Sequence, residues 1–161
     1  RRQPVLIPPG PDPAAESGWR AWFDGSALPN PGKMGLGIVL LAPDGTRTEH
    51  SSIAAGTGCN NEAELRALRA ALDLAFTAGA RALLLRGDSD VALRYVRGPD
   101  RTGIARLQVL IESARERLRR FDDVQLLWVP RHRNREADRL SRQALGLPES
   151  LPSKGRGRRR R

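Results

Sequence analysis

The chain has 161 residues, of which 39% are hydrophobic, and this fits one globular domain with a packed core rather than a disordered chain. Its single cysteine, Cys59, excludes an internal disulfide bond and favours a cytoplasmic location. Its apolar runs fall well short of the roughly 18 residues that cross a membrane. The formal net charge of +10 predicts a polyanionic partner such as nucleic acid.

The first part of the chain combines a proline-rich leader with strand patterns. Residues 1–17 lack apolar periodicity, so we expect a flexible leader or linker there. The aromatic-rich segment 19–24 ("WRAWFD") predicts a short strand. Residues 35–54 predict a hairpin, because the Asp-Gly pair of "PDGT" separates two apolar runs.

Helical periodicity begins at residue 60, where leucines and a phenylalanine recur every three or four positions up to a stop at Gly79. The remaining predicted elements are a buried strand at 80–88, helices at 89–98 and 104–121, a strand at 124–130 and a helix at 134–146. This order predicts an α/β domain over 18–147, with a mixed sheet that carries helices on its faces. Residues 148–161 predict a disordered basic tail, which either binds phosphate groups or only increases solubility.

Several acids fall where the predicted strands end or the predicted helices begin. Asp24 and Asp88 end two strands, and ligands of such sheets gather beyond the carboxyl ends of the parallel strands. Glu62, Glu64 and Asp138 lie in the first turns of helices, where any one of them could stabilise the helix dipole. Together these acids form a cluster of like charge that needs a cation, and an all-oxygen site suits Mg²⁺ or Mn²⁺.

The motifs "FDGSALPNPGKMGLG", "NNEAEL", "GDSD" and "WVPRHRNREADRLS" occur in this order, and over residues 18–147 the chain resembles type 1 ribonuclease H. The resemblance implies a ribonuclease H-like α/β fold, with a five-stranded mixed sheet flanked by helices. It implies an endonuclease that cuts the RNA strand of RNA–DNA hybrids and leaves 5′-phosphate and 3′-hydroxyl ends. It also implies two Mg²⁺ ions, with Mn²⁺ as a substitute, and no organic cofactor or membrane partner. We expect a monomer.

The resemblance assigns metal binding and catalysis to four carboxylates, which are Asp24, Glu64, Asp88 and Asp138. It selects Glu64 over Glu62, because the family's glutamate stands three places after the second asparagine. Helix geometry agrees, since residues two apart on a helix do not face the same way. We therefore expect Glu62 to be a solvated acid.

The resemblance also assigns a catalytic histidine and a set of substrate-binding asparagines. His132 matches a mobile histidine that assists proton transfer or product release. Asn60 and Asn61 match residues that touch the nucleic acid, and an amide can both donate to and accept from a ribose 2′-hydroxyl. Asn30 and Asn134 match further polar positions near the substrate, where they could also serve as a turn residue and a helix N-cap.

Three departures from the family pattern affect the predicted substrate contacts. Cys59 stands where many members have a threonine that holds a DNA phosphate, and Asp90 stands where some have glutamine. The stretch 98–123 has no room for the basic handle of some bacterial members. We expect its affinity to be replaced by the tail or by four arginines, which are Arg115, Arg117, Arg119 and Arg120.

Two other functions stay open at this point. One is a nucleic-acid-binding module without catalysis. The other is a different nuclease of the wider superfamily, such as a transposase or junction resolvase core. The paired asparagines favour the hybrid-specific enzyme over both.

Overall fold

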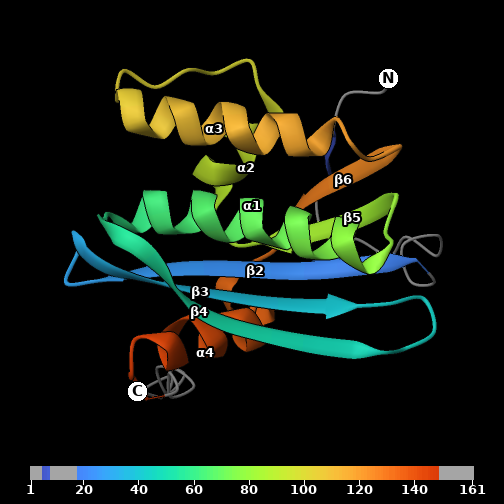
Figure 1. The fold of residues 1–161 in the computed structure, drawn as a ribbon, viewed down its shortest axis with the longest axis horizontal. Coiled ribbons are helices and arrows are strands. Elements are labelled where there is room, and N and C mark those ends of the chain that lie inside the picture. Colours follow the sequence, from blue (N-terminus) through green and yellow to red (C-terminus); the bar gives the residue numbers. More distant parts are fainter. Residues whose placement is uncertain (1–4, 8–17, 149–161) are drawn as a thin grey trace, which may run out of the picture.

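The computed structural model describes residues 5–7 and 18–148, which form one mixed sheet with helices on both faces (Figure 1). The strands are β1 (Val5–Ile7), β2 (Trp19–Leu28), β3 (Gly32–Leu41), β4 (Arg47–Gly58), β5 (Ala82–Gly87) and β6 (Asp123–Trp128). The helices are α1 (Asn60–Ala78), α2 (Asp90–Arg97), α3 (Ala105–Leu118), the short 3-10 helix η1 (Arg131–Arg133) and α4 (Arg135–Ala144).

The strand order is β1-β6-β5-β2-β3-β4. The neighbours β1, β6, β5 and β2 pair in parallel, and β3 pairs antiparallel with both β2 and β4. The five predicted strands are therefore confirmed, and β1 is a sixth. Within the leader that we expected to be flexible, Val5–Ile7 form a strand that pairs with residues 125–127 of β6. Three residues are too short a segment to show an alternating pattern, so the pairing depends on the exposed edge that β6 offers.

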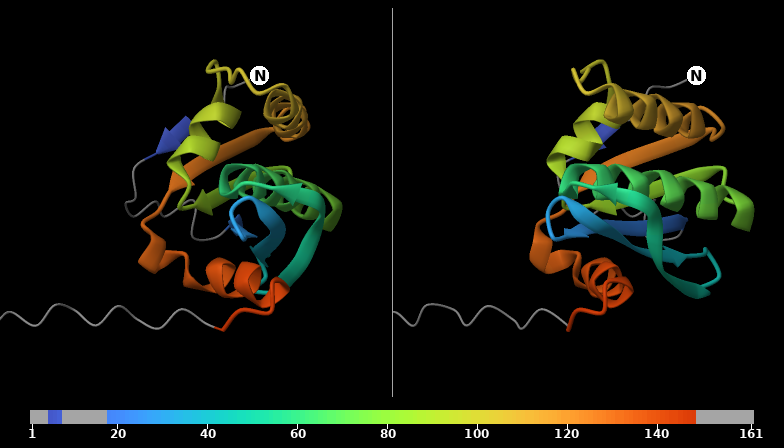
Figure 2. Two further views of the ribbon diagram at one scale, coloured as in Figure 1. Left: turned by 90° about the vertical axis from the view of Figure 1, so that its left-hand side faces the viewer. Right: turned by 60° about the vertical axis from the view of Figure 1, so that its left-hand side comes forward.

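The helices cover the two faces of the sheet unequally. The views agree that α1, α2 and α3 lie on one side of the sheet and α4 on the other (Figures 1 and 2). The main core lies under α1 and α3, where Ala67, Ala71 and Ala75 let α1 pack closely against the strands. Gly79 ends α1 in the left-handed conformation (φ 113°), as its position in the sequence predicts. Among the described residues, no helix is long and apolar enough to cross a membrane.

Strand β2 is longer than its sequence pattern predicts, and this changes the position of Asp24. The expectation that Asp24 ends a strand was wrong, because β2 continues to Leu28 in antiparallel pairing with β3. The parallel pairing of β2 with β5, however, stops at Phe23 and Gly87. Asp24 is therefore the first residue of β2 beyond the end of β5, so it still lies at the carboxyl edge of the parallel strands.

Glycines in β2 and β3 let two helices approach the sheet backbone to backbone. A Cβ atom on Gly25 would overlap the main chain of Ala63 in α1. A Cβ atom on Gly37, which pairs with Asp24 across the β2–β3 ladder, would overlap the carbonyl oxygen of Ala137 in α4. Both helices therefore bring their first turns against the segment of β2 that carries Asp24.

Candidate active site

Three carboxylates from three different elements meet at this edge of the sheet. Asp24 of β2, Glu64 of α1 and Asp88, which directly follows β5, each offer one oxygen atom within 4.8 Å of the others. They line an open pocket of about 330 Å³ whose other walls include Asn60 and Asp138. The structure thus places together three of the four acids that the sequence predicts for the metal site.

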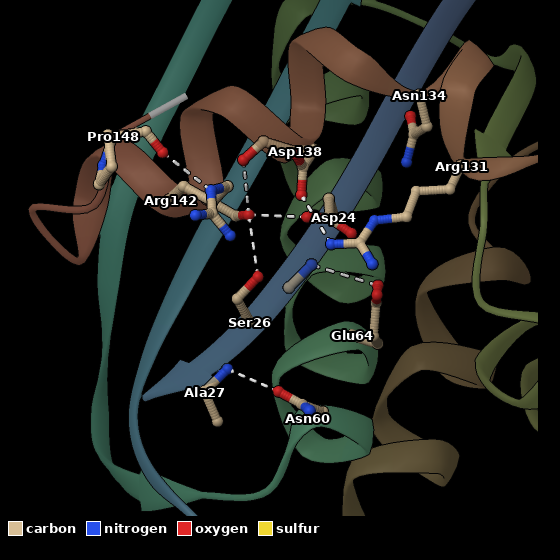
Figure 3. A network of polar contacts seen from close by, with 12 residues as sticks. Asp24, Ser26, Ala27, Asn60, Glu64, Arg131, Asn134, Asp138, Arg142 and Pro148 are labelled. Carbon is tan, nitrogen blue, oxygen red and sulfur yellow. Dashed lines mark hydrogen bonds and ion pairs between the residues drawn. The ribbon is translucent and has the colours of Figure 1, made fainter. Parts of the chain in front are cut away.

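Asp138 approaches the same pocket from the opposite wall. It lies in the first turn of α4 and is 8% exposed, but it is not a member of the tight group of three oxygens. Its Oδ1 atom is 3.8 Å from Nη2 of Arg131, and the guanidinium of Arg131 extends over the pocket in Figure 3. The fourth predicted acid therefore belongs to the pocket without touching the other three.

The acids raise one another's pKa values. Burial, followed by the charge of Asp88, raises the pKa of Asp24 from 3.8 to about 7, although a hydrogen bond from Ser141 opposes the rise. Burial, followed by the charge of Asp24, raises the pKa of Glu64 well above its ordinary value. Burial raises the pKa of Asp88, while a hydrogen bond with Asn134 opposes it.

The raised pKa values of these acids indicate that the pocket suits a cation. A hydrogen bond between Glu64 and Asp24 lowers the pKa of Asp24 and raises that of Glu64, so Glu64 is the acid that keeps a proton. The group therefore does not carry its full negative charge near neutral pH unless a cation balances it. Three carboxylate oxygens converging within one small pocket are the ligand type that Mg²⁺ and Mn²⁺ prefer, so the residues fit divalent ions of that kind.

The two glutamates at the start of α1 have different environments. The Oε2 atom of Glu64 accepts a hydrogen bond of 3.2 Å from the backbone N–H of Gly25 at the acid pocket. The expectation of a solvated Glu62 was wrong, because this side chain is buried and its Oε1 atom accepts a bond of 3.1 Å from Nε of Arg106 in α3. The bare backbone of Gly58 leaves space for the Glu62 carboxylate. Glu62 therefore joins α1 to α3 instead of facing water.

The predicted substrate-binding asparagines near α1 divide between two surfaces. Oδ1 of Asn60 accepts a 2.9 Å bond from the N–H of Ala27, and the backbone N–H of Asn60 donates to Oδ1 of Asn30 at 3.0 Å. Asn60 thus lies at the rim of the acid pocket (Figure 3), with Asn30 beside it. Asn61 is exposed and lines a separate groove of about 140 Å³ formed with α2 and the start of α3.

Asn134 lies inside the protein rather than on its surface. It is 1% exposed, and its Nδ2 atom donates a 2.9 Å bond to the carbonyl oxygen of Phe23, the residue before Asp24. It also hydrogen-bonds the side chain of Asp88. It occupies the N-cap position of α4, but its side chain makes no capping bond. In this conformation Asn134 ties together β2, the end of β5 and α4, and it presents no surface to a substrate.

His132 does not reach the acid pocket in this structure. It is exposed on η1 and lines a different cavity of about 390 Å³, together with Trp22 and Val39 of the sheet. Arg131, one residue earlier, lines the acid pocket instead. The sequence did not distinguish Arg131, because "PRHRNR" holds three arginines that the pattern alone cannot rank.

Two of the arginines that we expected to replace a basic handle are engaged within the fold. Arg115 donates to the carbonyl oxygens of Tyr95 and Asp100, and Arg117 forms an ion pair with Asp73. The expectation that these two offset the missing handle is therefore not supported. Residues 98–104 alone connect α2 to α3, which agrees with the expected absence of a handle.

The fold and the acid pocket together define a ribonuclease H-like protein, and comparison with known proteins agrees. The family model described as "Reverse transcriptase-like" matches residues 22–144. The crystal structure of RNase H1 from the archaeon Halobacterium salinarum superimposes with a TM-score of 0.74 at 38% identity and covers 80% of this chain and 97% of that one. The chain therefore belongs to the type 1 ribonuclease H family.

Other relatives extend this comparison. The chain is 35% identical over 123 residues to the bifunctional protein Rv2228c of Mycobacterium tuberculosis, covering 76% of this chain. LC11-RNase H1, which was isolated from compost and solved in complex with an RNA/DNA hybrid, matches with a TM-score of 0.71 at 26% identity and covers 80% of this chain and 96% of that one. The chain spans 63% of the full-length Halobacterium Ribonuclease HI and 34% of Rv2228c.

Proposed function

We propose that this protein is an endonuclease that hydrolyses the RNA strand of RNA–DNA hybrids with the help of two divalent metal ions. The observation that carries the proposal is the convergence of Asp24, Glu64 and Asp88 within 4.8 Å at the mouth of a pocket whose rim holds Asn60. The complex of the related LC11-RNase H1 with an RNA/DNA hybrid supports the choice of substrate.

In this proposal the acids hold the ions, and Mg²⁺ is the natural choice with Mn²⁺ as a substitute. Asp24, Glu64 and Asp88 supply the converging oxygens, and Asp138 completes the site from the α4 side. When bound, such ions supply an activated water and neutralise charge on the scissile phosphate and on the departing 3′-oxygen. The products then carry 5′-phosphate and 3′-hydroxyl ends.

The chain's own polar groups would select and orient the hybrid. Asn60 already uses its Oδ1 atom internally, so its Nδ2 atom is the group that can donate to a ribose 2′-hydroxyl. Asn30 is tied in the same way through Oδ1. Asn61, which faces the groove beside α2, would contact a neighbouring nucleotide.

The neighbouring residues Arg131 and His132 of η1 would have different roles. The Arg131 side chain is 75% exposed and stands over the acids, where its charge would bind a substrate phosphate. A role of His132 in proton transfer or product release stays a prediction that requires η1 to move. The monomeric state and the cytoplasmic location also stay predictions from the sequence.

A cleavage assay tests the proposal. Labelled RNA–DNA, RNA–RNA and DNA–DNA duplexes are incubated with the protein and Mg²⁺, with EDTA as a control and Asp24→Asn as a matched variant. We expect cleavage of the RNA strand of the hybrid alone, none with EDTA and none by the variant. Hybrid binding without cleavage in Mg²⁺ or Mn²⁺ would show a binding module, and cleavage of DNA duplexes would show a different nuclease of the superfamily.

A further inference from the structure

A buried hydroxyl of α4 contacts one acid of the cluster. Ser141 of α4 is completely buried, and its Oγ–H donates a 2.7 Å hydrogen bond to Oδ2 of Asp24. Ser26 of β2 lies 3.2 Å from the same hydroxyl. The dashed contacts of Figure 3 therefore join Ser26, Asp24 and the α4 backbone at Asp138 in one network.

The hydroxyl has one proton, and besides the Ser26 hydroxyl two acceptors lie within reach. The carbonyl oxygen of Asp138, three residues earlier in α4, lies 2.9 Å from Oγ, while the carboxylate of Asp24 lies 2.7 Å away. The carboxylate is the nearer acceptor, and when it is ionised it is also the stronger one. Ser141 therefore donates to Asp24, and its lone pairs remain free to accept the proton of Ser26.

The position of this hydroxyl depends on how closely the backbone of α4 approaches the sheet. A Cβ atom on Gly37 of β3 would lie 2.5 Å from the backbone nitrogen of Ser141, so only glycine lets α4 lie this close. Gly37 is also the residue that pairs with Asp24 across the β2–β3 ladder. Asp138 and Ser141 are three residues apart and share one helix face, so the same close approach brings Ser141 to Asp24 and Asp138 to the wall of the acid pocket.

We infer that Ser141 is a positioning residue, which fixes the orientation of the Asp24 carboxylate for binding a divalent ion; this inference rests on the proposed function. With Oδ2 tied to Ser141, rotation of the carboxylate is restricted. The carboxylate is then oriented before the ion arrives, and hydrogen bonds that orient a metal ligand in this way commonly change metal affinity by about 10- to 100-fold.

The test compares Ser141→Ala with Ser51→Ala. Ser51 is a matched control, because its hydroxyl donates a 2.6 Å bond to the carbonyl oxygen of Leu140, the neighbouring residue of α4, without touching an acid. Mn²⁺ binding is measured by calorimetry on the full chain without nucleic acid. The half-saturating Mg²⁺ concentration for hybrid cleavage is measured separately, and thermal unfolding in EDTA checks folding.

We expect Ser141→Ala to weaken Mn²⁺ binding and raise the half-saturating Mg²⁺ concentration by about 10-fold or more, and Ser51→Ala to leave both within about 2-fold. Should the alanine variant fail to fold, Ser141→Cys fills nearly the same space with a weaker donor and should show a loss in the same direction. Equal metal affinities for the Ser141 and Ser51 variants would overturn the inference and leave Ser141 a helix residue bonded to Asp138. Wild-type protein that neither binds Mn²⁺ nor cuts hybrid would instead overturn the proposed function.

Discussion

Replacing Asp24 by asparagine should stabilise the metal-free protein at alkaline pH while it abolishes cleavage. Asp24 is 5% exposed, and its pKa is raised from 3.8 to about 7, mainly by burial. Because one pKa unit corresponds to about 1.4 kcal/mol, this rise is worth about 4 kcal/mol of unfolding free energy. Removing the Asp24 charge also removes part of the rise in the pKa of Glu64, which adds to the gain. The neutral amide oxygen of asparagine accepts the hydrogen bond of Ser141 less strongly than a carboxylate does, which reduces the gain, so the expected net gain is about 2–4 kcal/mol.

The sign of the pH dependence follows from the proton that Asp24 binds. Between the ordinary pKa of 3.8 and the raised value of about 7, the folded protein keeps this proton and the unfolded chain has lost it. Raising the pH through this range therefore favours the unfolded chain, and the wild type loses stability relative to a variant without the acid. Below the lower value both states are protonated, and the advantage of the variant disappears.

Urea unfolding in EDTA, at about pH 4 and about pH 8.5, measures this difference for wild type and Asp24→Asn. The variant should exceed the wild type at the higher pH and match it at the lower. Adding Mn²⁺ at the higher pH should stabilise the wild type alone, because ligand binding to the folded state adds to its stability. A variant that is less stable than wild type at both pH values would refute the argument that burial of a charged Asp24 is unfavourable.

Three further predictions concern other parts of the molecule. Glu62→Gln should lower the unfolding free energy by about 1–2 kcal/mol with turnover retained, since it removes a buried charge that pairs with the largely exposed Arg106. Glu64→Gln should abolish turnover, and urea unfolding together with single-turnover cleavage separates the two effects. Arg131→Ala should slow cleavage about 10-fold or more, because its charge would bind the substrate phosphate. Its melting temperature should change little, because the Arg131 side chain is 75% exposed. The same cleavage assay on His132→Ala tests the role predicted for that histidine. Deleting residues 152–161, which lie outside the described residues, should reduce the slope of log affinity against log salt by about 2–3 units; an unchanged slope would mean that those residues do not bind phosphate.

The sequence by itself predicted the order of the elements from β2 to α4 and the acids that meet in one pocket. The spacing of leucines defined α1, and the Asp-Gly turn between β3 and β4 is built with Gly45 at a φ of 90°. These signals are local, because helix and turn patterns depend on residues a few positions apart. The motifs around Asp24, Glu64, Asp88 and Asp138 carried the family resemblance for the same reason: each is a short stretch that can be read without knowing its neighbours in space.

The tertiary structure decided which polar side chains are buried and what they touch. Glu62 becomes a buried partner of Arg106, and Asn134 becomes an internal link to Phe23, although both residues look like ordinary polar positions at helix starts. Ser141 reaches Asp24 across 117 positions in sequence because α4 lies directly on a glycine of β3. Contacts of this kind depend on how closely two backbones approach each other, and the residue pattern of a single segment does not predict that distance.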